Sequence, residues 1–339
     1  MIQKLQSSEG SELAMQFAAI QDRERNQADR PQTRHSFAVG AHLRRIAIVL
    51  SSAACRTWIP FLLLGALNRL LPIFASVFFC YAGNERYARH YGYKSCRNFQ
   101  LWFPSTIGVF RQGKKWGLIC ATTVTEAEFT DPKNSVDLER LLRRLQLMKT
   151  ILGVDKLSFA GILPTILNRR WPETINDGAR DHTPEVVRMA VHEVRRKHFN
   201  GRPHDIVLLG GAGRIGRAVY ECLKADGIDS IVVDPASRAT TAFKPQTSAS
   251  ILLVDVSRHG AIQRYVDKMP EGSVVLNEVF PEPSRDVLVE LTNRNIATYH
   301  IAGVTADVYP SLPLGYKNAL PCCAIHSSDL AEPILKRIA

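Results

Sequence analysis

A run of glycines near residue 210 has the spacing that binds the pyrophosphate of a dinucleotide. Gly211, Gly213 and Gly216 form a G-x-G-x-x-G pattern between the apolar segment 205–209 and an expected helix. In this pattern the first glycine permits a tight turn, the second lets the pyrophosphate approach the backbone, and the third allows close packing of helix and strand. Backbone N–H groups at the start of the helix then bind the phosphates.

The predicted cofactor-binding residues are this turn and three charged positions that follow it. They are Gly210, Gly211, Gly213, Arg214, Ile215, Gly216, Asp234, Arg238 and Glu278. Asp234 ends a second apolar segment, 230–233, where a carboxylate accepts hydrogen bonds from the adenosine ribose. Glu278 follows another apolar segment and is expected near the nicotinamide ribose. The alternative interpretation is a loop whose glycines serve packing alone.

The choice between the two nicotinamide cofactors depends on Asp234 and Arg238. The Asp234 carboxylate would repel the 2′-phosphate of NADP(H), whereas Arg238 is four residues further on and could receive it. We expect NAD(H) to be slightly favoured, because the carboxylate acts directly on the group that differs. No metal is expected, since the seven cysteines are scattered without a CxxC pair or zinc-ligand spacing. Such cysteine usage is typical of a reducing cytosol.

The elements that must position these residues alternate between strand and helix. Strands are expected at 205–209, 230–233, 251–256, 274–277 and 297–301, with helices at 259–268 and 284–293. This alternation predicts a doubly wound parallel sheet of the Rossmann type. A smaller α/β substrate domain is expected before it, with strands at 72–81, 116–123 and 157–160 and helices at 136–152 and 184–197.

The chain therefore divides into three predicted parts. Residues 1–45 are polar, which is typical of a disordered or loosely helical extension. Residues 46–200 form the substrate domain and residues 201–339 the nucleotide-binding domain. The segment Asn200-Gly201-Arg202-Pro203 serves as the linker.

Charge and hydropathy point to two kinds of partner. The formal net charge is +11, and residues 56–121 hold nine Lys or Arg against one acid, Glu85. Such a patch attracts an acidic partner, although a solvated basic face explains it equally, and no nucleic-acid motif accompanies it. Residues 46–82 are very apolar, but the uncharged runs 57–68 and 70–84 are shorter than the roughly 18 to 20 residues of a membrane span. We expect a cytoplasmic protein with possible peripheral membrane contact, in preference to an integral membrane protein.

Several further motifs occur in a defined order. They are VFRQGKKWGLI at 109–119, FAGILPTI at 159–166, Asp181-His182-Thr183, VLNEVFP at 275–281 and PCCA at 321–324. Together with the glycine turn, they resemble the aldehyde-forming long-chain acyl-ACP reductases, which share a two-domain plan similar to that of shikimate dehydrogenase. Residues before Leu70 have no counterpart in that family.

The resemblance implies an NAD(P)H-dependent reduction of an acyl thioester, carried by acyl carrier protein or CoA, to an aldehyde. The reaction would pass through an acyl-enzyme on cysteine, which is both a nucleophile and a leaving group. Cys322 fits the family register, with Cys323 as the second choice. Gly161, His182 and Thr183 would line the substrate cleft. An acidic carrier protein would match the basic patch, and the family leans to NADPH.

Three nearby residues have candidate roles in proton transfer. Cys322 and His326 are four residues apart, so on a helix they would share one face, and the histidine could hold the thiolate. His300 and Asp307 flank Gly303 after the last strand, where either could assist proton transfer. Buried structural roles are the alternative for all of them, and Thr183 before Pro184 equally fits a helix cap.

Two other functions remain open from the sequence. A shikimate-type alcohol or keto-acid dehydrogenase needs a Lys/Asp pair, and the nearest candidates are Lys149, Lys156 and Asp155 at a helix end. The third possibility is a nucleotide-binding partner protein without catalytic activity. Loss of activity on removal of the cysteine would separate the first hypothesis from both alternatives.

Overall fold

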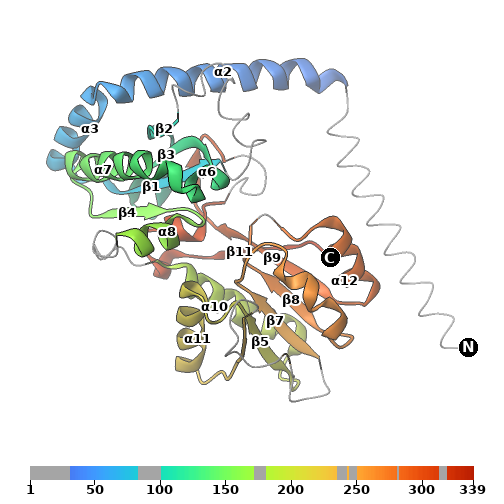
Figure 1. The fold of residues 1–339 in the computed structure, drawn as a ribbon. Helices are drawn as coiled ribbons and strands as arrows, with labels where there is room; N and C mark the ends of the chain where they lie inside the picture. The colour runs from blue at the N-terminus through green and yellow to red at the C-terminus, as the bar shows by residue number, and fades with distance from the viewer. Residues whose placement is uncertain are drawn as a thin grey trace, which may run out of the picture.

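The computed structural model describes residues 31–82, 101–171, 181–234, 243, 250–280, 282–312 and 319–339. These residues form an α/β structure with two sheets that are rich in parallel strand pairs (Figure 1). The α/β class predicted from the alternating pattern is confirmed.

The first sheet has five strands in the order β10-β2-β3-β1-β4. Its strands are β1 (Phe74–Ala82), β2 (Ser105–Gln112), β3 (Lys115–Thr125), β4 (Lys156–Phe159) and β10 (Asp307–Tyr309). β1 pairs in parallel with β3 and β4, whereas β2 pairs antiparallel with β3 and β10. The sequence motif at 109–119 is thus an antiparallel hairpin.

The second sheet has six strands in the order β11-β9-β8-β7-β5-β6. Its strands are β5 (Asp205–Leu209), β6 (Ile231–Val233), β7 (Ile251–Asp255), β8 (Val274–Asn277), β9 (Ala297–Val304) and β11 (Pro333–Arg337). All pairs are parallel except that of β11 with β9 at the edge. If the five parallel strands, β5 to β9, are numbered 1 to 5 in chain order, their order across the sheet is 2-1-3-4-5.

Helices cover both faces of the second sheet, which explains the unbroken apolar runs of its strands. The helices are α10 (Thr183–Val194), α11 (Arg214–Ala225) and α12 (Arg285–Asn293), with 3₁₀ turns η4 (Ala261–Arg264) and η5 (Val266–Lys268). Leu208 and Val254 pack with α10 and α11 on one face. Leu209 and Leu253 pack with α12 and the 3₁₀ turns on the other.

The first sheet is covered by helices on one face and by the C-terminal segment on the other. Its helices include α3 (Ile59–Leu70), α7 (Ser135–Leu152) and α8 (Leu163–Arg170), whose apolar residues pack on Val77 and Phe79. On the opposite face, Phe78 and Phe110 join the same core as Leu320, which lies in the C-terminal segment. The two sheets thus share one continuous apolar core.

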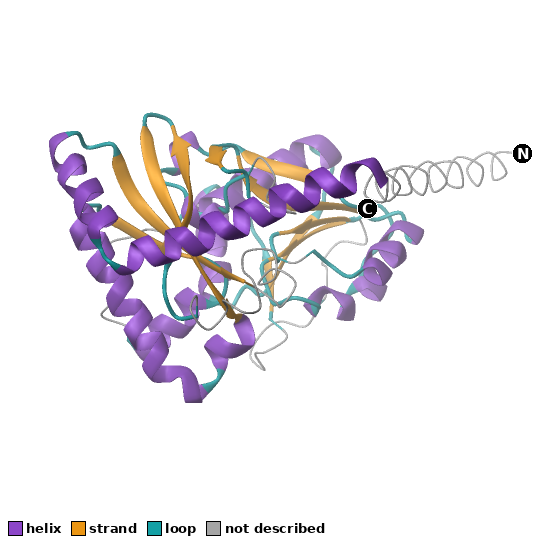
Figure 2. Cartoon of the chain, turned by 90° about the horizontal axis from the view of Figure 1, so that it is seen from above, coloured by secondary structure: helices purple, strands orange, loops and turns teal. Residues whose placement is uncertain are grey.

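The longest helix, α2 (Pro31–Arg56), runs across the first sheet and contacts β2 (Figures 1 and 2). Among the described helices no single one is long and apolar enough to cross a bilayer. The part of α2 from Arg45 passes that test together with α3 on length and composition, with a bend of 78° between them. The short remaining elements are α6 (Glu126–Thr130), η2 (Pro132–Asn134), η3 (Arg195–Phe199), η7 (Cys322–Ala324) and η8 (Ser328–Leu330).

Two expected helices differ from the structure. The segment 259–268 forms the two 3₁₀ turns η4 and η5 instead of one α-helix, because Gly260 has φ +81° and Tyr265 interrupts the helical hydrogen bonding. The helix expected at 184–197 ends at Val194 and continues as the π-helical turn η3. The other expected strands and helices are present to within a few residues.

The predicted domain limits also differ from the architecture. The predicted limit between the N-terminal extension and the substrate domain, at residues 45 and 46, lies inside α2. This helix is continuous from Pro31 to Arg56. Residues 31–45 are therefore helical, and residues before 31 lie outside the described part. β10 belongs to the second predicted domain by sequence but pairs with β2 of the first sheet, through Asp307–Arg111 and Tyr309–Val109.

Candidate functional site

The glycine turn lies at the carboxyl end of β5, where it connects that strand to α11. Gly210 has φ +88° and its N–H donates to the Val233 carbonyl at 2.7 Å. A Cβ at Gly216 would lie 2.2 Å from the Gly210 carbonyl oxygen, so only glycine lets α11 begin this close to the turn. Gly213 is exposed, and a Cβ there would meet only the Gly210 oxygen, at 3.2 Å. The exposed position of Gly213 and the close packing at Gly216 match the two roles expected of a dinucleotide turn.

The remaining predicted cofactor residues lie on two sides of this turn. Arg214 and Ile215 open α11, which places their backbone N–H groups in its first turn. Asp234 directly follows β6, the strand next to β5. Arg238 lies outside the described residues. The choice between NAD(H) and NADP(H) therefore remains a prediction from Asp234.

Glu278 lies at the carboxyl end of β8, and its N–H donates to the Asp255 carbonyl at the end of β7 at 2.9 Å. Burial raises the pKa of the Glu278 carboxyl to about 8, and the negative charges of Asp181 and Asp255 act in the same direction. Burial also raises the pKa of Asp255 to about 6, although Ser257 donates both its hydroxyl and its N–H to one oxygen. Asp255 was not among the residues predicted from the sequence, although its position at the end of a wholly apolar strand was an available signal.

Asp181 connects the glycine-turn helix to α10. Its carboxylate accepts hydrogen bonds from the Arg214 guanidinium at 2.8 Å and from the Thr183 N–H at 3.0 Å. Burial alone would raise the pKa of Asp181, but the Thr183 and Arg214 hydrogen bonds hold it below its usual range. The cap position of α10 is His182, which makes no side-chain cap bond. The proposed cap by Thr183 is therefore wrong, because Thr183 is already the first helical residue.

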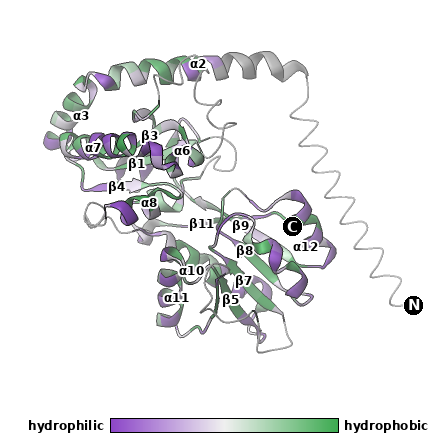
Figure 3. Ribbon diagram, viewed as in Figure 1, coloured by the Kyte–Doolittle hydropathy of each residue, from purple (hydrophilic) through white to green (hydrophobic). Residues whose placement is uncertain are grey.

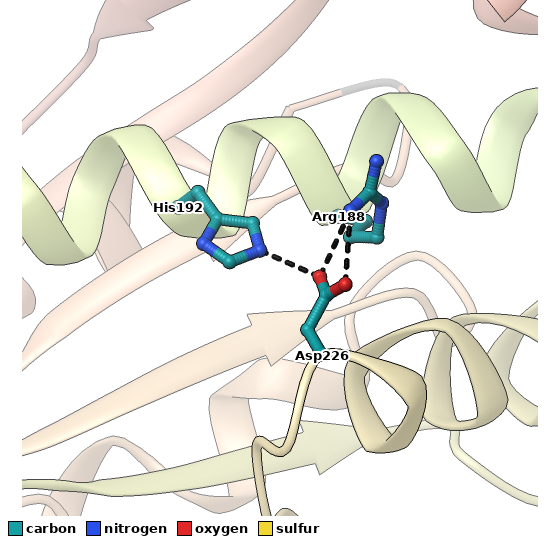
Figure 4. A network of polar contacts seen from close by, with 3 residues as sticks. All are labelled: Arg188, His192 and Asp226. Carbon is teal, nitrogen blue, oxygen red and sulfur yellow. Dashed lines mark hydrogen bonds and ion pairs between the residues drawn. The ribbon is translucent and has the colours of Figure 1, made fainter.

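A second contact fixes the far end of the same helix pair (Figure 4). Asp226, at the C-terminal end of α11, accepts two hydrogen bonds from Arg188 at 2.9 and 3.1 Å. It also lies 2.6 Å from His192 Nε2. His192 and Arg188 together lower the pKa of Asp226. With the Asp181–Arg214 bond, this contact holds α10 and α11 in one register along their length.

The two adjacent cysteines lie at the junction of the sheets. They are on the 3₁₀ turn η7, which contacts β4 and α10. Cys322 is 7% exposed and belongs to the shared core, whereas Cys323 is half-buried. Burial raises the pKa of both thiols, and the charges of Glu278 and Asp181 raise it further.

Lys156 completes this cluster from β4. Its ammonium donates to the Ile325 carbonyl at 2.7 Å. Burial lowers the pKa of Lys156, while Asp181 and Cys323 act in the opposite direction because a nearby negative charge favours the ammonium. The structure thus brings Asp181 within electrostatic reach of Lys156, Glu278 and Cys323.

His326 does not support the cysteines as predicted. The turn that holds Cys322 ends at Ala324, and Ile325 is extended at φ −66° and ψ 150°, so no helical face joins Cys322 to His326. The His326 ring stacks on Phe110 with centroids 4.9 Å apart. Burial lowers the pKa of His326 to about 4, helped by Lys156 and Lys115. The ring is therefore neutral at physiological pH.

His300 and Asp307 do not join the cluster either. His300 is buried in β9, where its Nδ1 accepts a hydrogen bond from the Asn277 amide at 2.9 Å. Since alternate residues of a strand point to opposite faces, and Tyr299 and Ile301 face the core that holds Cys322, His300 points the other way. Asp307 is exposed and accepts two hydrogen bonds from Arg111, at 2.7 and 3.0 Å. Both residues have the contacts expected of the structural alternative, and proton transfer by either stays a prediction.

The predicted substrate residues have mixed positions. Gly161 has φ +59°, and a Cβ there would lie 2.3 Å from the Tyr81 hydroxyl. That hydroxyl accepts the Ile162 N–H at 3.1 Å, and the charge of Cys323 acts on the phenol. Gly161 therefore adjoins the cluster through Tyr81, a residue that the sequence analysis did not single out. His182 and Thr183 are buried beside Asp181 at the start of α10.

A separate cationic hollow of about 510 Å³ lies at the opposite end of β5 from the glycine turn. It is lined by His192, Arg195, Arg196, Asn200, Gly201, Arg202, Pro203 and His204. Among the described residues, no group of three or more His, Cys, Asp or Glu is arranged to hold a metal ion. The polar cluster at η7 is thus composed of acid–base and thiol groups.

Comparison with known proteins gives little further information. No protein-family model matches the sequence, and no curated protein matches it. The chain is similar to a crystal structure from Mycobacterium smegmatis, with 11% identity and a TM-score of 0.29. The similarity covers 68% of this chain and 80% of that one. A likeness this weak carries no argument, so function must be inferred from the described residues.

Proposed function

We propose that the chain is an NAD(P)H-dependent oxidoreductase that reduces an acyl thioester, on acyl carrier protein or CoA, to an aldehyde. The observation that carries the proposal is the proximity of Glu278 to Asp181 and Cys323 of the polar cluster. Glu278 follows β8 at the same edge of the sheet as the glycine turn, with β7 between them. This arrangement joins a dinucleotide-type turn to groups suited to thiol and proton chemistry.

The second sheet supports a Rossmann-type nucleotide site. Its parallel strands run 2-1-3-4-5, so the direction of winding reverses at β5, and ligands of open α/β sheets bind outside the carboxyl ends of the strands at such a point. Gly210, Gly211, Gly213 and the first turn of α11 would hold the pyrophosphate, and Asp234 the adenosine ribose. The Asp234 carboxylate favours NAD(H) slightly over NADP(H). A bound reduced nicotinamide supplies two electrons and a hydrogen to the acyl carbon.

Cys323 is the better of the two candidate nucleophiles. It is more exposed than Cys322, and the Lys156 ammonium favours its thiolate. Since the thiol pKa is raised, a base is needed, and the Glu278 carboxylate is the residue of suitable pKa. The Cys323 sulfur would then bond to the acyl carbon as the bond to the carrier sulfur breaks, and the carrier leaves as a thiol with the transferred proton. After reduction the aldehyde leaves, and a proton returns to the Cys323 sulfur.

A second candidate function follows from Lys156 and Asp181. A lysine whose ammonium is favoured by the charge of a nearby aspartate is the kind of pair that a shikimate-type alcohol or keto-acid dehydrogenase requires. The sequence analysis considered Lys156 but missed its partner, because the two residues are far apart in the chain. In this function Lys156 would give a proton to the product oxygen, and neither cysteine would be needed.

In the first step of the test, the purified full chain is titrated with NADH and with NADPH. Binding is monitored by nicotinamide fluorescence. Acyl-CoA and acyl-carrier thioesters are then added, with aldehyde release as the readout. We expect Cys323→Ala to abolish aldehyde formation, while Cys222→Ala, a control on α11, keeps it. Full activity in both Cys322→Ala and Cys323→Ala would end the thioester proposal.

The same titration separates the alternatives. Loss of alcohol or ketone turnover in Lys156→Met, with the cysteine variants active, would favour the dehydrogenase. Tight binding without turnover of any substrate would favour a nucleotide-binding partner protein. Turnover with NADPH alone would show that the expected preference for NAD(H) is wrong.

A further inference from the structure

The outward faces of α2 and α3 carry a dense group of exposed apolar side chains, which we call the leucine face. Its members are 43–79% exposed, and they are Leu43, Ile46, Leu50, Ile59, Leu62, Leu63, Leu67, Leu70 and Leu71. In the rest of the described chain, only Val136, Leu147, Val289 and Tyr309 are large apolar residues with comparable exposure. Concentration of this kind marks an interaction surface, because single exposed apolar residues are normally scattered. Figure 3 shows the hydrophobic colouring along α3.

The orientation of α2 is fixed by polar contacts on its inner side. The Ser52 hydroxyl lies 2.6 Å from that of Ser105, and the Ser51 hydroxyl donates to the Thr106 carbonyl at 2.8 Å. The inner face of α2 thus carries Ser51 and Ser52, which bond to β2, together with the buried Ile48 and Cys55, and its outer face carries further leucine and isoleucine. An apolar outer face is unusual for a surface helix of a soluble protein.

α3 is oriented in the same way by Asn68. Its buried amide donates to the Leu152 and Phe74 carbonyls, both at 3.0 Å, and its carbonyl accepts the Phe74 N–H at 2.7 Å. These bonds prevent α3 from rotating its leucines inward. The exposure of the leucine face is therefore a property of the described fold.

The charge of this region identifies the kind of partner. From Pro31 to Asn84 the sequence has five arginines and no acidic residue. The positive charge of this segment would repel a second copy, whereas an anionic lipid surface would attract it and cover the leucine face. Arg56 ends α2 with its guanidinium over the Phe103 ring, 4.9 Å from the centroid.

We propose that the leucine face docks on the surface of an anionic lipid bilayer. α3 has 12 residues. At 1.5 Å rise per residue it is about 18 Å long, shorter than the roughly 30 Å hydrocarbon core, so it lies in the interface without crossing the core. The 78° bend at Trp58 allows both helices to lie along one surface. The proposal depends on none of the residues of the proposed reaction.

The test is sedimentation of the full chain with vesicles of phosphatidylcholine alone or mixed with phosphatidylglycerol. We expect about ten-fold tighter binding to the anionic vesicles at low salt, weakened by high salt. Leu63→Glu/Leu70→Glu should lose this binding, while Val289→Glu, at an exposed apolar site on α12, should keep it. Unchanged thermal unfolding would show that both variants are folded.

Two results would overturn the proposal. One is vesicle binding by Leu63→Glu/Leu70→Glu at the wild-type level. The other is a wild-type chain that binds neither kind of vesicle and forms a dimer, if the double substitution dissociates that dimer. This result would assign the leucine face to a second copy.

Discussion

Arg214, the first residue of the helix that follows the glycine turn, donates a 2.8 Å hydrogen bond to Asp181 at the entrance to α10. This bond joins the two halves of the candidate site. Asp181 also places a negative charge near Cys323 and Glu278, which raises the pKa of both groups. A single carboxylate therefore fixes the helix pair and controls the ionisation of the cluster.

Replacing Asp181 with Asn should make Cys323 more acidic. The substitution removes a negative charge and leaves the Lys156 ammonium to act on the thiol, so the thiol pKa should fall by about one unit. The rate of alkylation by iodoacetamide measured against pH gives this value without any substrate. Asp226→Asn, which releases the other end of the helix pair, is the matched control. Identical alkylation profiles for wild type and Asp181→Asn would contradict the prediction.

Replacing Glu278 with Gln should change how stability depends on pH. The folded-state pKa of Glu278 is about 8, above its ordinary value of 4.5. Between those values the folded chain holds a proton that the unfolded chain has lost, so this group makes the fold less stable as pH rises from about 4.5 to about 8. Glu278→Gln should therefore raise the melting temperature by about 2 °C at pH 8.5 and leave it unchanged at pH 4.5. Exposed Glu271→Gln should follow the wild type at both pH values.

Two alanine substitutions in the glycine turn should separate cofactor binding from folding. Gly213→Ala places its Cβ at an exposed position 3.2 Å from the Gly210 carbonyl oxygen, so it should lower the melting temperature far less than Gly216→Ala while weakening dinucleotide binding about ten-fold or more. Gly216→Ala forces a Cβ against the Gly210 carbonyl and should lose both binding and about 2 kcal/mol of stability. Calorimetric titration and thermal unfolding measure the two effects. Wild-type affinity in Gly213→Ala would argue that the glycines serve packing alone.

Replacing Asn68 with Ala should destabilise the first sheet strongly. The buried Asn68 amide satisfies the Leu152 carbonyl, the Phe74 carbonyl and the Phe74 N–H, and their loss should cost about 2 to 3 kcal/mol. Urea unfolding measures this cost. Asn134→Ala removes one partly buried hydrogen bond to Glu128 and should cost less than half as much. Equal costs for the two variants would show that Asn68 does not anchor α3.

The sequence predicted features that depend on local pattern. The glycine turn, Asp234 after β6 and Glu278 after β8 are each set by neighbouring residues, so the apolar runs were enough to place them. The electrostatic effect of Asp181 on Lys156 was not predictable in this way, because it depends on the contacts of both β4 and α10 with η7. His326 was misplaced because the spacing from Cys322 implied a helix, whereas the chain makes only a 3₁₀ turn there. The outward apolar face of α2 and α3 was equally hidden, since apolar composition alone does not show which side a helix buries.

The pairing of β10 with β2 affects how the two sheets can move. The chain passes from the first sheet to the second before β5, returns to the first at β10, and goes back to the second at β11. A domain closure must therefore bend three connections at once instead of one flexible linker, and its rotation is confined to the axis that all three allow. A fragment that ended near residue 200 would also leave β2 without its edge partner, open to pairing with another chain.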